Sequence, residues 1–214
     1  MTSDFVWHME DVLDLYGKPY DPKHPVICFD ERPCQIIGDA VMPIPMKPGN
    51  PKKEHYEYIR NGTCCIFMAF EPLAGKRLVY VKKHRTKVDY ADFMKNIAEQ
   101  YPNAESIRLV QDNLNTHTAG SFYVALPPEE AFELAKKFEF HFTPKKGSWL
   151  NMAEIELSAL SKQCLDRRIE TMEKLAVEVD SWEKERNSAK ATVRWRFDKS
   201  DARKKLQRHY FNLQ

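Results

Sequence analysis

The stretch IRLVQDNLNTHTAG, residues 107–120, leads an apolar run directly into Asp112 and Asn113 and reaches His117 five positions after the aspartate. A second run rich in β-branched and aromatic residues, HPVICFDER at residues 24–32, also meets an acid, Asp30. Short runs of this kind are typical of buried strands. An acid at the end of such a strand either forms a turn or presents a carboxylate at the edge of the sheet, and the pattern leaves both interpretations open.

The segment between the two runs predicts a hairpin and a helix. Residues 63–84 predict two antiparallel strands around a turn, whereas four prolines within residues 39–54 predict an exposed loop. Residues 89–101 carry apolar side chains at helical spacing, and Asp89 is the expected N-cap.

After Asp112 the chain alternates helix, strand and helix. Residues 127–138 open with prolines and acids and predict a helix, and residues 138–142 alternate as a strand does. From Trp149 onward the sequence is helical, with a long charged helix over residues 169–185. This order of elements predicts an α/β fold, a mixed sheet with helices on its faces.

The composition is that of a globular protein, with 43% hydrophobic and 12% aromatic residues in a chain of 214. The chain has no basic-then-apolar start and no run of about 18 apolar residues, so a cytoplasmic, nucleoid-associated protein that does not contact a membrane is expected. Its five cysteines lack the paired spacing of a zinc site and are expected to be reduced thiols.

Positive charge is concentrated at the C-terminal end. Residues 187–214 contain eight Lys or Arg against two Asp, a net +6, which leaves −4 for the rest of the chain. A basic tail of this kind is compatible with a polyanionic partner and equally with a solvated helix face.

A third acid, Glu154, lies in the first turns of the helix that follows Trp149. The apolar face of this helix adjoins a narrow polar strip, which comprises Asn151, Glu154, Ser158 and Ser161. If the strands ending in Asp30 and Asp112 are neighbours, Glu154 crosses their edge, and three acids there repel one another unless a divalent cation is bound. Hard oxygen ligands favour two Mg²⁺ or Mn²⁺ ions, which activate a nucleophile and stabilise the leaving oxygen of a phosphodiester. The alternatives are an Asx turn at Asp112, a solvated strand end at Asp30 and a capping box from Asn151 to Glu154.

Several blocks in this order resemble the catalytic core of DDE transposases of the mariner superfamily, in the bacterial insertion-sequence branch. They are CFDER, LVQDNLNTHT and HFTPKKGSWLNMAEIELSALSKQCL, supported by HYEYIRNGT and WRFDKSDARKKLQRHY. The resemblance implies a ribonuclease H-like fold with a helical C-terminal extension. It implies a lead segment at residues 1–23, the catalytic domain at 24–168 and a helical basic extension at 169–214.

The same resemblance implies the site residues. Asp30, Asp112 and Glu154 are the expected catalytic and metal-binding acids, and 41 residues separate the last two. Glu154 is preferred to Glu156 because it directly follows Asn-Met-Ala. Lys145, Lys146, Trp149 and His117 are the expected DNA-binding residues, although His117 could instead orient Asp112 or cap the following helix.

The implied activity is metal-dependent cleavage at transposon ends followed by transfer of the 3′-hydroxyl into target DNA. The expected partners are double-stranded DNA, at terminal inverted repeats and at the target, and further copies of the chain. About twenty residues precede the first strand, which is too short for a helix-turn-helix module, so a companion polypeptide is expected to read the ends. Two other hypotheses stay open: a non-catalytic DNA-binding or assembly remnant of a transposase, and a cellular ribonuclease H-like nuclease.

Overall fold

The computed structural model describes residues 2–211 and contains one five-stranded sheet in the order β3-β2-β1-β4-β5. Its strands are β1 (Val26–Asp39), β2 (Tyr58–Glu71), β3 (Lys76–Lys82), β4 (Ile107–Gln111) and β5 (Phe138–Phe142). The first three strands pair antiparallel, and β1, β4 and β5 run parallel. This mixed sheet confirms the predicted fold class.

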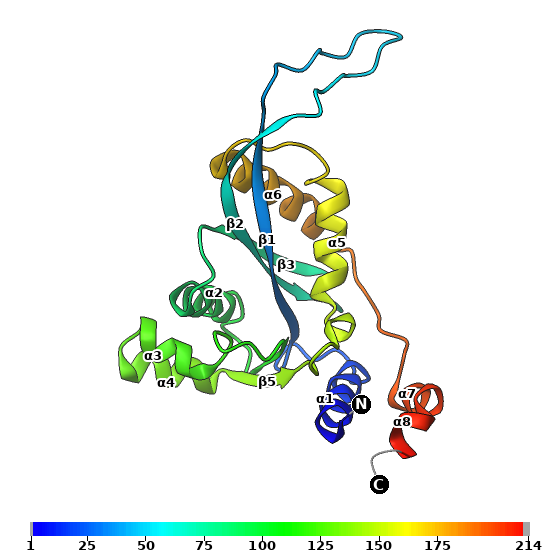
Figure 1. Cartoon of the computed structure of the whole chain (residues 1–214). Coiled ribbons are helices and arrows are strands. Elements are labelled where there is room, and N and C mark those ends of the chain that lie inside the picture. Colours follow the sequence, from blue (N-terminus) through cyan, green and yellow to red (C-terminus); the bar gives the residue numbers. More distant parts are fainter. Residues whose placement is uncertain (1, 212–214) are drawn as a thin grey trace.

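Helices cover both faces of this sheet (Figure 1). They are α1 (Ser3–Tyr16), α2 (Lys87–Gln100), α3 (Phe122–Ala125), α4 (Pro128–Lys136), α5 (Ala153–Gln163), α6 (Met172–Ser188), α7 (Lys199–Lys205) and α8 (Gln207–Phe211). Because side chains alternate along a strand, Cys28 of β1 points into the core under α1, α5 and α6, and Phe29 into the core under α2 and α4. The apolar face expected for α5 is buried from Leu150 to Cys164.

Three details of the helices differ from expectation. Residues 191–198, within the region predicted to be helical, form no helix. The N-cap of α2 is Thr86, not Asp89; the aspartate is the third helical residue and completes a capping box, in which each side chain bonds the other's backbone N–H. The expected lead segment contains α1, whose Met9, Val12 and Leu13 are buried in the core.

The proline-rich segment between β1 and β2 projects from the body of the molecule, as predicted for an exposed loop (Figure 1). Its base is fixed by the connection between α5 and α6. Arg168 donates to Asp39 at 2.7 Å and to the carbonyl of His55 at 2.6 Å, and the backbone N–H of Ile37 donates to Ile169 at 3.0 Å. The connection therefore anchors the ends of both long strands.

Candidate active site

Asp30 and Asp112 lie at the same level because β1 and β4 are adjacent and parallel. The prediction that Asp30 ends its strand is wrong, because β1 continues to Asp39, whereas β4 ends at Gln111 just before Asp112. Cys28 is level with Val110, so Asp30 and Asp112 are each two residues further along their strands. Asp30 follows Cys28 in the alternation and therefore faces α5. Two acids more than 80 residues apart in the sequence are thus brought to one level of the central strands.

The start of α5 is tied to the same edge by Asn151. Its side-chain amide donates to the carbonyl of Phe29 at 2.7 Å and to Asp30 Oδ2 at 3.3 Å, and its Oδ1 accepts the backbone N–H of Ala153 at 3.1 Å. Asn151 is 1% exposed, so these bonds form in the core, where polar groups need partners. This bridge fixes the first turn of α5 against Asp30.

Glu154 and Glu156 occupy opposite environments in that first turn. Glu154 is exposed, whereas Glu156 is 0% exposed and forms ion pairs with Arg77 and Arg186, both at 2.8 Å. No capping box forms around Glu154, because the N-cap of α5 is Met152 without a side-chain cap. Glu154 is therefore the acid at this turn whose carboxylate is free to bind something outside the fold.

The three carboxylates influence one another electrostatically. Burial raises the pKa of Asp30 to about 7, and the charges of Glu154 and Asp112 add to this rise, while the backbone N–H of Glu31 and the nearby His117 oppose it. Asp30 Oδ1 accepts that N–H at 2.8 Å. A carboxyl group with a pKa near neutrality in a cluster of acids is stabilised in its charged form by a cation.

Whether the residues fit a divalent metal depends on their chemistry and on their positions. Within residues 2–211, no three His, Cys, Asp or Glu side chains converge closely enough to hold an ion as they stand. The donors themselves fit: they are hard oxygen ligands, and among the described residues only Asp112 of the three has an ion-pair partner, His117. Glu154 is exposed, so its side chain is free to change rotamer when an ion binds.

His117 is buried beneath this edge and supports Asp112. It is 1% exposed and packs between the rings of Phe29 and Tyr90, at centroid distances of 5.1 and 5.0 Å. Its Nδ1 lies 2.5 Å from Asp112 Oδ1, and its Nε2 faces a Glu31 oxygen at 3.4 Å. Of the roles expected for His117, orienting Asp112 matches this geometry, because a side chain this buried does not reach a DNA surface.

The carboxylates around His117 also determine its charge. Burial lowers the pKa of His117, but the hydrogen bonds and charges of Asp112 and Glu31 outweigh burial and raise it to about 9. The two carboxylates therefore favour the protonated form of the ring. The side chain of Asp112 accepts this bond, so its partner is His117 and not the backbone of an Asx turn.

A groove of about 460 Å³ opens beside the carboxylates, between β1 and α5. Glu154, Ser158 and Ser161 line it from α5, and Arg32 lines it from β1. The polar strip expected on α5, apart from the buried Asn151, therefore forms one wall of a groove.

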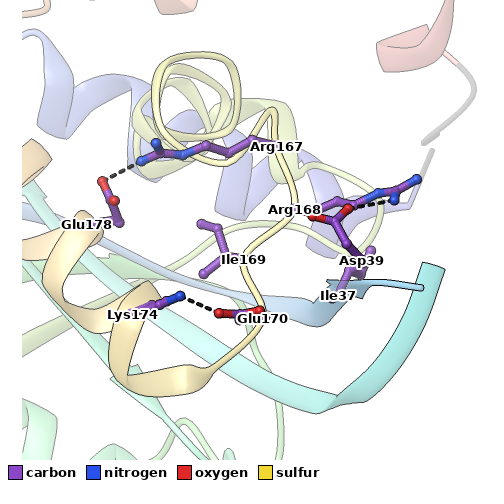
Figure 2. Close-up of a pocket in the computed structure, with 9 residues that line it drawn as sticks. Ile37, Asp39, Arg167, Arg168, Ile169, Glu170, Lys174 and Glu178 are labelled. Carbon is purple, nitrogen blue, oxygen red and sulfur yellow. Dashed lines mark hydrogen bonds and ion pairs between the residues drawn. The ribbon is translucent and has the colours of Figure 1, made fainter. Parts of the chain in front are cut away.

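A second pocket, of about 210 Å³, lies at the far end of β1 (Figure 2). Its charged side chains pair with one another: Arg167 with Glu178, Arg168 with Asp39, and Lys174 with Glu170. These pairs neutralise the lining, so this pocket serves to anchor the α5–α6 connection.

Lys145, Lys146 and Trp149 precede α5 on an exposed turn. Gly147 N–H donates to the carbonyl of Pro144 at 2.7 Å, and Lys146 takes the left-handed backbone conformation, with φ of 66°. Trp149 is 47% exposed and stacks on Trp195 with ring centroids 6.2 Å apart. Two lysines and an aromatic face thus lie a few residues from Asn151.

Replacing Asp30 with Asn is expected to stabilise the metal-free protein at pH 8. The folded state raises the pKa of Asp30 from 3.8 to about 7, so above pH 7 it bears the full cost of a buried charge, and this cost falls as the pH drops from 7 toward 4. We expect Asp30→Asn to raise the free energy of unfolding by about 1–3 kcal/mol at pH 8. Urea denaturation in EDTA at pH 8, 6 and 4.5 measures it, and a gain that does not shrink with falling pH would contradict this account of Asp30.

Comparison with known proteins identifies the fold. The family model described as "DDE superfamily endonuclease" matches residues 25–176. No curated protein matches the sequence significantly. Among solved structures, the Mos1 mariner paired-end complex with Mn is 14% identical and superposes with a TM-score of 0.59 over 89% of this chain and 59% of that one.

Two further complexes are similar to the same extent. The Mos1 strand transfer complex is 14% identical, with a TM-score of 0.59 over 88% of this chain and 56% of that one. The Mos1 paired-end complex with Mg is 15% identical, with a TM-score of 0.56 over 91% and 61%. The sheet and its flanking helices therefore match the ribonuclease H-like fold of the Mos1 catalytic domain, and the chain spans about three-fifths of the proteins in these structures. Among residues 2–211, no helix is long and apolar enough to cross a membrane.

Proposed function

This chain belongs to the DDE superfamily endonuclease family, and from that membership we propose that it is the catalytic domain of a transposase. The proposed activity is metal-dependent DNA cleavage and strand transfer at insertion-sequence ends. The observation that carries this proposal is the level placement of Asp30 and Asp112 on adjacent parallel strands, with Glu154 near enough that its charge and that of Asp112 help to raise the pKa of Asp30. The proposal includes the boundaries of a catalytic domain at residues 24–168 and a basic helical extension at 169–214.

Asp30, Asp112 and Glu154 are the proposed ligands of two Mg²⁺ or Mn²⁺ ions. When bound, such ions activate a water or a 3′-hydroxyl and stabilise the leaving oxygen of a phosphodiester. Solved Mos1 complexes contain Mn and Mg, which supports the same choice of metal here.

The residues around the acids have separate tasks in this proposal. Asp30 and Asp112 extend from rigid strands, and His117 holds the Asp112 carboxylate in one orientation through its Nδ1. Asn151 holds the start of α5 against Asp30. In this proposal the backbone at Glu154 is therefore fixed, and only its exposed side chain moves when the ions bind. His117 is thus a positioning residue, and DNA contact is assigned to the exposed Lys145, Lys146 and Trp149.

Double-stranded DNA, at the inverted repeats and at the target, is the proposed partner. The Mos1 structures are paired-end and strand transfer complexes, which supports an assembly of several copies on DNA for this chain. A helix-turn-helix region, in a companion polypeptide or elsewhere in the full protein, is proposed to read the ends, and the protein is proposed to act at the nucleoid.

Nicking of oligonucleotide duplexes that carry an element's ends tests the proposal. We expect nicking that requires Mn²⁺ or Mg²⁺ and that Asp112→Asn abolishes. A folded protein that binds these duplexes without metal-dependent nicking would instead be a non-catalytic DNA-binding or assembly remnant. Nicking with turnover on duplexes that lack such ends would indicate a cellular nuclease.

Lys146→Gly is expected to stabilise the fold and to weaken DNA binding. The left-handed conformation of Lys146 costs a non-glycine residue about 1–2 kcal/mol, whereas glycine adopts it freely. Allowing for the greater chain entropy of glycine when unfolded, we expect a gain of about 0.5–1 kcal/mol in the free energy of unfolding. The loss of one phosphate contact should lower the slope of log affinity against log salt by about 0.9.

Lys145→Gly is the matched control for this variant. It removes the same charge from the adjacent position, where the backbone is not left-handed, so we expect a loss of stability and a similar loss in the salt slope. Stability is read by urea denaturation, and affinity by fluorescence anisotropy with a labelled duplex in EDTA. If the two variants changed stability in the same direction, the backbone of Lys146 would not be strained.

A further inference from the structure

A strap of extended chain, residues 189–198, joins α6 to α7 on the side of the sheet that α5 covers (Figure 1). It has no regular secondary structure, but its side chains alternate as in a strand, with Val193, Trp195 and Phe197 half-buried and Arg194 and Arg196 exposed. The backbone N–H of Val193 donates to the carbonyl of Pro72 at 2.9 Å. The strap is therefore held in a defined orientation, with an apolar side inward and a basic side outward.

The inward side fixes the strap beside the exposed turn that precedes α5. Trp195 stacks on Trp149 and contacts Tyr16 at a centroid distance of 5.5 Å, and Phe197 meets the edge of Trp149 at 6.0 Å. Aromatic pairs of this kind add to the burial that holds two segments together. The strap therefore packs against Trp149. This residue follows the turn that carries Lys145 and Lys146 and lies two positions before Asn151 of the candidate site.

Two of the eight basic residues of the C-terminal region have a carboxylate partner among the described residues. Further along the chain, Lys199 pairs with Asp14 and Arg203 pairs with Glu10 at 2.6 Å, so these cations dock α7 on α1. Among the described residues, Arg194 and Arg196 have no such carboxylate partner, and both are exposed. Lys199 and Arg203 therefore form ion pairs within the fold, whereas the positive charges of Arg194 and Arg196 face solvent.

We propose that Arg194 and Arg196 of the strap bind the phosphate backbone of double-stranded DNA, as a continuation of the surface that Lys145 and Lys146 begin. This inference deepens the proposed function and rests on it for the identity of the polyanion. Two unneutralised guanidinium groups at alternate positions of an extended chain match a repeating line of phosphates, and arginine binds phosphate oxygens through paired N–H donors. The Trp149–Trp195 stack joins the strap to the turn, so both bind as one surface.

Salt dependence of DNA binding tests this assignment without reference to cleavage. The variant Arg194→Gln/Arg196→Gln is compared with the unaltered chain by anisotropy, using a labelled duplex without transposon ends, in EDTA, from about 50 to 200 mM NaCl. Each phosphate contact contributes about 0.9 to the slope of log affinity against log salt, so we expect the slope to fall by about 1.8. Both side chains are exposed, so the fold is expected to survive, and tryptophan fluorescence of the Trp149–Trp195 stack verifies this.

The matched control removes two positive charges from the opposite side of the sheet. Lys95 of α2 and Lys136 of α4 are paired with Glu130 and Glu133, so Lys95→Gln/Lys136→Gln is expected to leave the slope unchanged. An unchanged slope in the strap variant, or an equal fall in the control, would overturn the assignment. Because the assay contains no metal, either result is independent of whether Asp112→Asn abolishes nicking.

Discussion

Glu154→Gln is expected to reduce metal-dependent DNA cleavage at least about 10³-fold while leaving the protein folded. The amide keeps the volume of the side chain but loses the negative charge that a divalent ion requires. The side chain of Glu154 is exposed and accepts no hydrogen bond from the described residues, so the substitution costs the fold little stability. We expect single-turnover nicking and strand transfer in Mn²⁺ to fall together.

Glu173→Gln is the matched control for this experiment. Glu173 is the second residue of α6, as Glu154 is of α5, and both are exposed. Each substitution removes one charge from a helix N-terminus, at a cost of about 0.3–1 kcal/mol in the free energy of unfolding. Equal small losses of stability, with activity lost only in Glu154→Gln, are the expected outcome. Near-normal nicking by Glu154→Gln would remove Glu154 from the site.

Local sequence pattern predicted the elements and much of the site. The ends of two apolar runs located Asp30 and Asp112, and the parallel register of β1 and β4 brings them to one level, although β1 continues past Asp30 to Asp39. The polar strip on α5 was visible at helical spacing and, apart from the buried Asn151, forms one wall of a groove. These features follow from short-range periodicity, which sequence carries well.

The features that sequence did not predict depend on long-range contacts or on competing local signals. Helix α1 was treated as a lead segment, although Met9, Val12, Leu13 and Tyr16 recur at helical spacing and signalled an amphipathic helix. Asp89 was predicted as the N-cap of α2, but Thr86 is also a good capping residue, and only the backbone shows that the helix begins after Thr86. The burial of His117 depends on Phe29 and Tyr90, which are distant in sequence. The short spacing between Asp112 and His117 therefore could not predict that the histidine is buried.

Glu156→Gln is expected to destabilise the fold by about 3–5 kcal/mol, because removing one partner of a buried ion pair leaves the other charge uncompensated. Glu156 Oε2 accepts from Arg77 Nε at 2.8 Å and from Arg186 Nε at 3.2 Å, and its Oε1 accepts from Arg186 at 2.8 Å. Arg77 is 2% exposed, and its guanidinium also donates to the carbonyl of Gly75 at 2.6 Å. The substitution therefore leaves the buried guanidinium of Arg77 without a negatively charged partner, at the point where β3, α5 and α6 meet.

The pH dependence of this effect has a defined sign. Burial raises the pKa of Glu156, but the hydrogen bonds and charges of Arg77 and Arg186 outweigh burial and hold it below its usual range. The stabilisation is therefore complete above the unfolded pKa of 4.5 and is lost as the pH falls through the lowered value. Urea denaturation at pH 7.5 should show the full difference between Glu156→Gln and the unaltered chain, and the difference should shrink in acid.

The same substitution at two positions of one helical turn then separates fold from chemistry. Glu154 and Glu156 are two residues apart, so they point to different sides of α5, one into solvent beside the groove and the other into the arginine pair. We expect Glu154→Gln to be stable and inactive, and Glu156→Gln to be unstable but active at temperatures where it stays folded. Nicking by Glu156→Gln is therefore measured well below its melting temperature, with the folded fraction fixed by circular dichroism. If Glu156→Gln were folded but inactive and Glu154→Gln were active, the third carboxylate of the site would be Glu156. Arg77 and Arg186 would then hold that carboxylate in position.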